Sequence, residues 1–296
     1  MSEPILVQAA ELNALLASEK NGDILVCDCS FDLADPAAGR RAHEAEHIPG
    51  AVYVGLEEDL SAPRTGKNGR HPLPDAQWFA ARMAQLGASD DTLIVAYDNA
   101  SGMYAARLWW MLGWAGHSRR RVLDGNLNAW KAAHLPLASG PSPKKSAGSF
   151  SLRPALHTMV DYATVQANLT RGERQLIDAR NNERFRGQNE TLDKKAGHIP
   201  GARNRFFMQN LQADGRYKQP GILHEEYSAL LGDVKPENVV NQCGSGVTAC
   251  HNLLAMELAG LSGSALYPGS WSEWSQQDNA PVATGDANFT APENRR

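Results

Sequence analysis

Long apolar runs are missing from this sequence, and none approaches the roughly 20 residues that a membrane-spanning helix requires. Positive charge is not in excess either, because the formal net charge is −4; we therefore expect no nucleic-acid or membrane partner. The first residues contain neither the basic stretch nor the apolar core of a secretory signal, which favours a cytoplasmic protein. A chain of 296 residues with 42% hydrophobic residues favours two globular domains.

Cysteine is also scarce, since the whole set consists of four residues at positions 27, 29, 243 and 250. No cysteine or histidine pairs have the spacing of a zinc site, so we expect no metal, and free thiols fit a reducing compartment. Cys27 and Cys29 lie two apart in an apolar run, which predicts that both point to one face of a buried strand. Cys250 is interpreted as a buried helix residue, whereas Cys243 has a different setting.

The two halves of the chain repeat each other. Five segments recur in the same order: 24–28 as 175–178, 47–51 (HIPGA) as 198–202, 93–98 as 238–243, 107–116 as 251–260, and 123–130 as 267–274. Such an ordered repeat predicts a duplicated domain. A stretch rich in Pro, Gly, Ser and Lys separates the copies and is typical of a linker. We predict an N-terminal domain over 1–137, a linker over 138–155, a C-terminal domain over 156–288 and a tail over 289–296.

Each copy alternates short apolar runs with amphipathic stretches, which predicts an α/β fold whose parallel sheet is covered by helices on both faces. In the second copy we expect strands at 175–178 and 238–242, and helices at 224–232 and from about 246. Reactive groups of such folds usually lie beyond the carboxyl ends of the strands. Cys243 follows directly after one of the expected strands.

Features that the two copies share are interpreted as structural, and features that differ as functional. His47 and His198 precede Ile-Pro-Gly in both copies, and we expect them to hold the fold. Cys243 differs, because its counterpart in the first copy is Asp98. Any cysteine chemistry was therefore kept in the second copy alone.

The loop that follows Cys243 reads GSGVTA. Its two glycines let backbone N–H groups turn inward, and the N-terminus of the following helix adds positive potential, which together favour a thiolate. A cysteine-dependent phosphatase needs arginine at the sixth position after its cysteine, and this chain has Ala249 there. That residue argues against phosphoryl transfer, whereas a persulfide is small enough for the loop. A plain glycine turn with a buried cysteine is the alternative interpretation.

The CGSGVTA loop, the doubled His-Ile-Pro-Gly and GSWSEW at 269–274 together resemble the two-domain rhodanese superfamily over residues 5–280. Within it, the chain is similar to the branch that takes sulfur from 3-mercaptopyruvate. The resemblance implies two tandem rhodanese-like domains, of which the first is inactive with Asp98 in place of cysteine. It also implies an enzyme that carries sulfur as a persulfide on Cys243 without a cofactor. Relatives that use thiosulfate resemble Cys-Arg-Lys-Gly at this loop, whereas Gly244 and Ser245 are uncharged.

The resemblance implies how the substrate is held. Arg184, the first residue of RFRG, would bind the substrate carboxylate through its planar fork. A second arginine expected further along this segment is missing, and Lys194 or Lys195 would replace it as a point charge.

The resemblance also implies a relay like that of the serine proteases, made of Ser245, His71 and Glu57. His71 has no counterpart in the second copy, which favours a functional role. The N–H groups that would cradle the persulfide are those of Gly244, Ser245, Gly246, Val247, Thr248 and Ala249.

The function implied is transfer of sulfur from 3-mercaptopyruvate through Cys243 to a thiophilic acceptor, with release of pyruvate. Cyanide or a thiol protein such as thioredoxin would act as the acceptor, and the enzyme is expected to be a monomer. Two alternatives use the same persulfide. One is a thiosulfate:cyanide sulfurtransferase, and the other is a non-enzymatic carrier that receives its sulfur from a partner protein.

Overall fold

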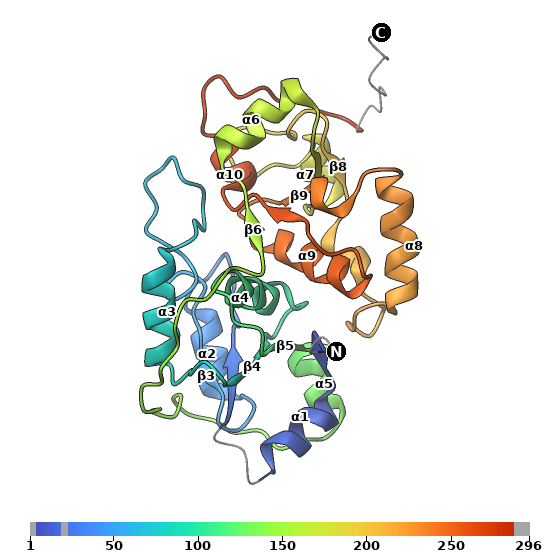
Figure 1. Ribbon diagram of the computed structural model, residues 1–296. Helices are drawn as coiled ribbons and strands as arrows, with labels where there is room; N and C mark the ends of the chain where they lie inside the picture. Colours follow the sequence, from blue (N-terminus) through green and yellow to red (C-terminus); the bar gives the residue numbers. More distant parts are fainter. Residues whose placement is uncertain (1–3, 19–22, 287–296) are drawn as a thin grey trace.

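Two five-stranded parallel sheets form the framework of the computed structural model, which describes residues 4–18 and 23–286 (Figure 1). The strand order is β1-β5-β4-β2-β3 in the first sheet and β6-β10-β9-β7-β8 in the second. Every strand pair in both sheets is parallel. The two orders are the same once each strand of the first sheet is matched to its counterpart, which confirms the duplicated α/β fold.

The first domain contains β1 (Leu6–Val7), α1 (Ala9–Leu16), β2 (Ile24–Asp28), α2 (Ala38–Ala45), β3 (Val52–Tyr53), α3 (Ala76–Gln85), β4 (Leu93–Tyr97), α4 (Met103–Trp114), β5 (Arg120–Leu123) and α5 (Asn126–Ala132). The second contains β6 (Thr158–Met159), α6 (Tyr162–Arg171), β7 (Gln175–Asp178), α7 (Asn182–Arg186), β8 (Arg203–Asn204), η2 (Phe207–Asn210), α8 (Pro220–Leu231), η3 (Pro236–Asn238), β9 (Val239–Gln242), α9 (Thr248–Leu258), β10 (Ala265–Leu266) and α10 (Ser270–Trp274).

The expected elements of the second copy are close to those observed. β7 has the expected bounds, and β9 ends at Gln242 as expected. Helix α8 begins four residues earlier than the expected 224, at Pro220. A proline is well suited to the first position of a helix, because its missing N–H would have no partner there and its φ is already helical.

Alternation along the strands explains why helices cover both faces of each sheet. In β2, Cys27 packs in the cluster that contains α3 and α4, whereas Val26 packs in the cluster that contains α1 and α5. In β7, Ile177 packs in the cluster that contains α8 and α9, whereas Leu176 packs in the cluster that contains α6, α7 and α10. Neighbouring residues of a strand point to opposite faces, so both faces need an apolar cover.

The two domains pack through equivalent helices, α4 and α9, which each follow the middle strand of their own sheet (Figure 1). Residues 104–113 of α4 are all buried. A helix that is apolar around its whole circumference needs cover on every side. α4 obtains this cover from its own sheet and from α9, so one apolar cluster runs through both domains.

The segment 138–155 forms no helix and no regular strand, and it runs along the first domain. The Gly148 N–H donates to the Ala84 carbonyl at 2.8 Å, and the Ser151 hydroxyl donates to Asp90. Phe150 is buried against the core of the same domain. The predicted linker is thus fixed to the first domain by specific bonds. The predicted tail, 289–296, lies outside the described residues.

Several residues interpreted from the sequence as structural are buried. Cys27, Cys29 and Cys250 are fully buried, and the first two share one apolar cluster, as predicted. His47 bonds to the His43 carbonyl at 2.7 Å, and His198 bonds to the Phe185 carbonyl at 2.8 Å. Each histidine therefore ties its His-Ile-Pro-Gly segment to the helix before it.

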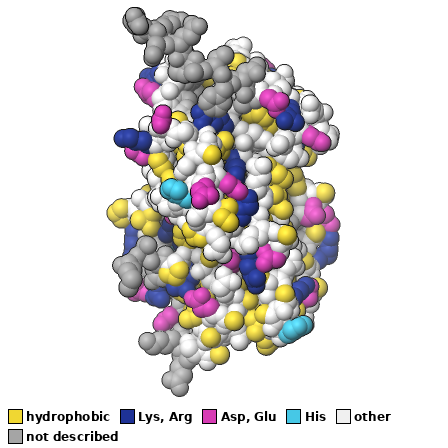
Figure 2. All heavy atoms as spheres, turned by 90° about the vertical axis from the view of Figure 1, so that its right-hand side faces the viewer, with side chains coloured by type: hydrophobic (Ala, Val, Ile, Leu, Met, Phe, Trp, Pro, Cys, Tyr) yellow, Lys and Arg dark blue, Asp and Glu magenta, His cyan; other side chains and the backbone are white. Residues whose placement is uncertain are grey.

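The surface carries charges of both signs. On the face shown in Figure 2, basic and acidic side chains are interspersed with apolar atoms, and no continuous basic area is seen on that face. No helix among the described residues is both long enough and apolar enough to cross a bilayer.

Candidate active site

Cys243 lies at the carboxyl end of β9, the middle strand of the second sheet, and is 2% exposed. Both its backbone N–H and its carbonyl form hydrogen bonds with the start of α10. The Cys243 N–H donates to the Ser270 hydroxyl at 3.1 Å, and the Trp271 N–H donates to the Cys243 carbonyl at 2.9 Å. These bonds fix the cysteine at the floor of the site, where Sγ accepts the Gly246 N–H at 3.1 Å.

Gly246 sets the shape of the loop above the cysteine. Its φ is +75°, and a Cβ at this position would lie 2.4 Å from the Pro268 carbonyl oxygen. Glycine is therefore required here for both its backbone conformation and its size. The turn leads directly into α9 at Thr248, and the first N–H groups of an α-helix have no partner within the helix. The loop and the helix start together provide donors and positive potential next to Sγ.

The equivalent loop of the first domain contains a bound anion, its own aspartate. The carboxylate of Asp98 accepts N–H bonds from Ala100, Gly102, Tyr104 and Ala105, at 2.9–3.1 Å. Asp98 occupies the position that Cys243 occupies in the second domain, at the end of the middle strand. A loop of this design can therefore hold negative charge by backbone N–H groups alone.

Ser245 and His71 meet across the domain interface. Nδ1 of His71 lies 2.9 Å from the Ser245 hydroxyl oxygen, and both residues are buried. Burial, followed by the positive charges of Arg107, Arg70 and Arg64, lowers the pKa of His71 to about 3. His71 is therefore neutral near pH 7 and can exchange a hydrogen bond with the serine in either direction.

Glu57 lies near His71 without bonding to it. Oε1 of Glu57 is 3.9 Å from Nε2 of His71, which is longer than a hydrogen bond, and Nε2 is buried without a partner among the described residues. The Glu57 carboxylate is paired with Arg64 instead. Of the three residues predicted to form a relay, Ser245 and His71 are thus in contact, whereas Glu57 does not bond to His71.

Arg184 lies in α7 and points toward the cysteine loop. Asn181 caps this short helix by accepting the Arg184 N–H, and the guanidinium forms ion pairs with Glu190 and Asp193 at 3.0 and 2.9 Å. The side chains of Glu190 and Asp193 are each only 2% exposed. A Cβ built on Gly244 would lie 3.5 Å from Nη1 of Arg184, so this nitrogen lies next to the residue that follows Cys243.

The two lysines expected to assist Arg184 lie elsewhere. Lys194 pairs with Asp278 at the surface. Lys195 donates to the Gln277 carbonyl at 2.7 Å and lies close to the Asp278 carbonyl. Neither lysine lines the cavity that contains Cys243. In this arrangement both lysines bind the segment that follows α10.

Two arginines of the first domain reach the cysteine loop although the sequence did not identify them as site residues. Arg107, fully buried in α4, donates to the carbonyls of Gly246, Leu60 and His71 at 3.0–3.2 Å. It therefore joins the cysteine loop to the segment that carries His71. A single arginine within the apolar stretch 103–114 was the available signal. Arg70 also reaches the loop, since its Nη2 would lie 3.3 Å from a Cβ on Gly244.

The reactive groups line one cavity of about 290 Å³ between the domains. The first domain contributes Arg70 and His71, and the second contributes Arg184, Cys243 and Ser245. The uncharged residues of the cysteine loop are thus accompanied by two arginines from other segments. The lack of charge within the loop therefore does not by itself decide between thiosulfate and 3-mercaptopyruvate as the sulfur donor.

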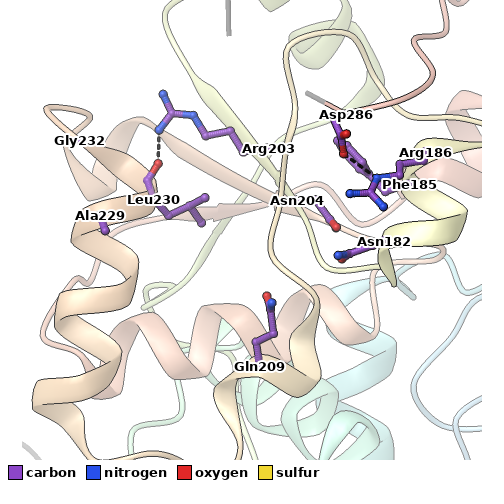
Figure 3. A pocket seen from close by; sticks show the side chains of 10 residues that line it. All are labelled: Asn182, Phe185, Arg186, Arg203, Asn204, Gln209, Ala229, Leu230, Gly232 and Asp286. Carbon is purple, nitrogen blue, oxygen red and sulfur yellow. Dashed lines mark hydrogen bonds and ion pairs between the residues drawn. The ribbon is translucent and has the colours of Figure 1, made fainter. Parts of the chain in front are cut away.

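A second cavity, of about 500 Å³, lies on the second domain and is shown in Figure 3. Helix α7 lies between the two cavities, because Arg184 lines the first and Arg186 lines the second. Arg186 is paired with Asp286, as the dashed line in Figure 3 indicates. The lining of this cavity includes no cysteine or histidine. Within the described ranges, no group of three or more acidic, histidine or cysteine side chains is arranged to hold a metal.

Comparison with known proteins gives consistent matches over the whole chain. The rhodanese-like domain family model matches residues 8–133 and again residues 161–277. A Pseudomonas aeruginosa protein named "Probable 3-mercaptopyruvate sulfurtransferase" is 47% identical over 288 residues, which cover 97% of this chain and 100% of that protein. The thiosulfate sulfurtransferase of Cricetulus griseus is 35% identical over 270 residues, which cover 88% of this chain and 86% of that protein.

Similarity extends to solved structures. The 3-mercaptopyruvate sulfurtransferase from Leishmania major superposes on this chain with a TM-score of 0.82 at 28% identity. The superposition covers 94% of this chain and 76% of that one.

Proposed function

Because this chain belongs to the rhodanese family, we propose that it is a sulfurtransferase that moves sulfur from 3-mercaptopyruvate to a thiophilic acceptor through a persulfide on Cys243. The observation that carries the proposal is the position of the Cys243 sulfur. It lies at the floor of an interdomain cavity, accepts the Gly246 N–H, and faces the start of α9. Such a site stabilises a thiolate before the reaction and a persulfide anion after it.

In the first half-reaction, the Cys243 thiolate attacks the sulfur of 3-mercaptopyruvate and forms an S–S bond. The C–S bond of the substrate breaks, and its electron pair passes to the methylene carbon as the enolate of pyruvate. The thiol proton of the substrate is transferred to that carbon, so the products are pyruvate and Cys243–S–S⁻. Charge and atoms balance without an added oxidant or reductant.

Proton transfer in this step is assigned to Ser245 and His71. Because the pKa of His71 is lowered to about 3, the residue reacts from its neutral form. Its Nδ1 lies 2.9 Å from the serine oxygen, which allows the serine to pass a proton between the substrate and the ring. Glu57 could support the ring only after it leaves Arg64, and we give it no role in the first step.

In the second half-reaction, an acceptor thiolate attacks the outer sulfur of the persulfide and leaves with it as R–S–S⁻, which restores the Cys243 thiolate. Cyanide would leave as thiocyanate. We propose a thiol protein such as thioredoxin as the natural acceptor, in a reducing compartment. This half-reaction also requires no cofactor.

The test is pyruvate release from 3-mercaptopyruvate with cyanide or a dithiol present. Cys243→Ser should abolish both pyruvate release and cyanide-releasable sulfur, while Cys250→Ser, which keeps a donor for the Gly246 carbonyl, should retain activity. A higher kcat/KM for thiosulfate than for 3-mercaptopyruvate would establish the thiosulfate alternative. A persulfide on Cys243 without turnover of either small donor would establish the carrier alternative.

A further inference from the structure

Arg107 is a buried cation that has no carboxylate beside it among the described residues. It lies in the middle of α4, is fully buried, and donates only to backbone carbonyls and toward thiols. Burial lowers the pKa of Arg107, and the thiols of Cys250 and Cys243 act against that shift. A guanidinium nevertheless stays protonated in proteins, and a buried charge is costly unless an opposite charge compensates it. The surroundings of Arg107 therefore call for a negative charge that is not a carboxylate.

Gly246 connects Arg107 to two thiols. Its carbonyl accepts from Nη1 of Arg107 at 3.0 Å and from the Cys250 thiol at 3.3 Å. Its N–H donates to Sγ of Cys243 at 3.1 Å. Cys250 cannot supply negative charge near pH 7, because burial raises the pKa of its thiol to about 12. Cys243 is the remaining thiol whose ionised form can balance the charge of Arg107.

The other charged groups around Cys243 balance one another. Its cavity is lined by three further arginines and by two titratable rings: Arg70, Arg180, Arg184, His71 and Tyr104. The three arginines are paired with three carboxylates, those of Asp193, Asp178 and Glu190. Both rings are neutral near pH 7, because burial lowers the pKa of His71 to about 3 and raises that of Tyr104. Arg107 thus differs from the other arginines near the cysteine in lacking an acidic partner within the described part of the chain.

The duplicated fold provides a comparison for Arg107. Its counterpart in the repeat is His251 of α9, whose Nε2 lies 3.2 Å from the Ser101 carbonyl in the loop that holds Asp98. Each of the two helices thus sends a polar side chain to the loop of the other domain. Burial lowers the pKa of His251 to about 3, so this histidine is neutral near pH 7. The loop with four N–H bonds to its anion has a neutral neighbour, whereas the loop with one N–H bond to its sulfur has a cation.

We propose that Arg107 is a positioning residue that acts through Gly246, and that its buried charge is balanced by the Cys243 thiolate and later by the persulfide anion. The part that concerns the persulfide rests on the proposed function, whereas the part that concerns the thiolate describes the protein before any reaction. Opposite charges attract more strongly in a buried site than at the surface. The first domain therefore favours ionisation of the nucleophile in the second, and the thiolate compensates the buried arginine.

The test is the pH dependence of Cys243 alkylation by iodoacetamide, which reacts with the thiolate and requires no sulfur donor. Mass spectrometry of the peptide that contains residue 243 distinguishes it from the other three cysteines. Arg107→Gln keeps a donor for the carbonyls but removes the charge. We expect its half-maximal alkylation rate at a pH about one unit higher than in the wild type, the effect of losing a nearby opposite charge. Arg107→Lys restores the charge and should reverse most of this change.

Arg120→Gln is the matched control. Arg120 is another buried arginine of the first domain, and it donates to the His117 carbonyl at 2.8 Å. It lies at the amino end of β5 and outside the cavity that contains Cys243. Its variant should lower the melting temperature without changing the alkylation profile. If Arg107→Gln also leaves the profile unchanged, the charge of Arg107 does not act on Cys243, and the proposal is overturned.

A second variant without charge separates the charge from the shape of the loop. Arg107→Met fills a similar volume but donates no hydrogen bond. Equal changes of the profile in Arg107→Gln and Arg107→Met support the proposal, whereas a change in Arg107→Met alone means that the carbonyl bonds act on the cysteine and overturns it. If the melting curve shows that Arg107→Gln does not fold, Arg107→Met is compared with Arg107→Lys. A change in the methionine variant alone supports the proposal, and an equal change in both overturns it.

Turnover separates this inference from the proposed reaction. With 3-mercaptopyruvate as the donor, Arg107→Gln should lower kcat/KM about tenfold at the acid end of the pH profile. It should leave kcat/KM within about twofold at the alkaline end, where the cysteine of both proteins is ionised. If 3-mercaptopyruvate is not turned over, the alkylation profile still decides the role of Arg107. An equal loss of kcat/KM at every pH with an unchanged alkylation profile overturns the inference and leaves the proposed function intact.

Discussion

The loops after β4 and β9 have the same length and the same place in the two halves of the molecule, but their backbone N–H groups bind different side chains. Each connects the middle strand of its sheet to a helix, over residues 98–102 and 243–247. In the first loop the Asp98 carboxylate accepts four backbone N–H bonds. In the second, the Cys243 sulfur accepts one, from Gly246. The first loop is filled by its own side chain, and the second has donors left for an added sulfur.

The difference teaches that one anion-binding loop can serve stability in one copy and chemistry in the other. The first domain nevertheless contributes residues to the site. It supplies His71 to Ser245, places Arg70 beside Gly244, and binds the Gly246 carbonyl through Arg107. The second domain supplies the nucleophile, whereas the first supplies its surroundings.

Exchanging the residues of the two loops should have the largest effect. Cys243→Asp places the first domain's anion in the second domain's loop, and we expect sulfur transfer to fall by more than about 10³-fold, because the nucleophile is gone. The protein should keep a melting temperature near that of the wild type, because the loop can bind a carboxylate as its counterpart does. Thermal unfolding monitored by circular dichroism, together with pyruvate release, checks both results.

Cys243→Leu is the matched control for this exchange, because it removes the nucleophile without supplying an acceptor. It should abolish transfer equally and melt at a lower temperature than Cys243→Asp. If the aspartate variant is the less stable of the two, the second loop is not built to hold negative charge, and its comparison with the first fails.

The converse change concerns stability alone. Asp98→Ala leaves four N–H groups without an acceptor, and three of them are buried, so we expect the free energy of unfolding to fall by about 3 kcal/mol. Burial raises the pKa of Asp98 while its N–H bonds act against that shift, which shows how completely the side chain is enclosed. Urea unfolding at pH 7 gives the value. A loss below about 1 kcal/mol would mean that the four bonds contribute little net stability.

The same comparison shows what the sequence could predict. The ordered repeat was enough to predict the fold. The change from aspartate to cysteine identified Cys243 because both copies use the same loop geometry. A second cation beside Arg184 was expected from the same stretch of the chain, whereas Arg70, whose guanidinium also lies near Gly244, comes from a segment of the other domain. No periodicity in the sequence reveals which surface segment docks across a domain interface.

The next largest effect is expected from a change at Ser245. The residue at the same position of the first loop is Ala100. Ser245→Ala makes the second loop match the first at this point and removes the contact to His71. We expect kcat for pyruvate release to fall about 100-fold, the usual size for a proton-transfer group, with KM nearly unchanged. Steady-state kinetics with 3-mercaptopyruvate measures both. A large rise in KM with unchanged kcat would instead assign the serine to substrate binding.

The smallest effect tests His71, for which the second domain has no counterpart. Its folded-state pKa is lowered to about 3, whereas the unfolded chain has the usual value of about 6.5. Between these values the unfolded state binds a proton that the folded state excludes, so the free energy of unfolding falls as the pH drops below 6.5. At pH 5 this one residue should cost about 2 kcal/mol relative to pH 7.

His71→Gln removes this dependence but leaves that of His251, whose pKa burial also lowers to about 3. The stability lost between pH 7 and pH 5, measured by urea unfolding at both pH values, should therefore be smaller in the variant than in the wild type. An equal loss in both proteins would mean that His71 can be protonated where it lies. It would then react as an imidazolium, and the neutral exchange with Ser245 would have to be replaced by donation of a proton from the ring.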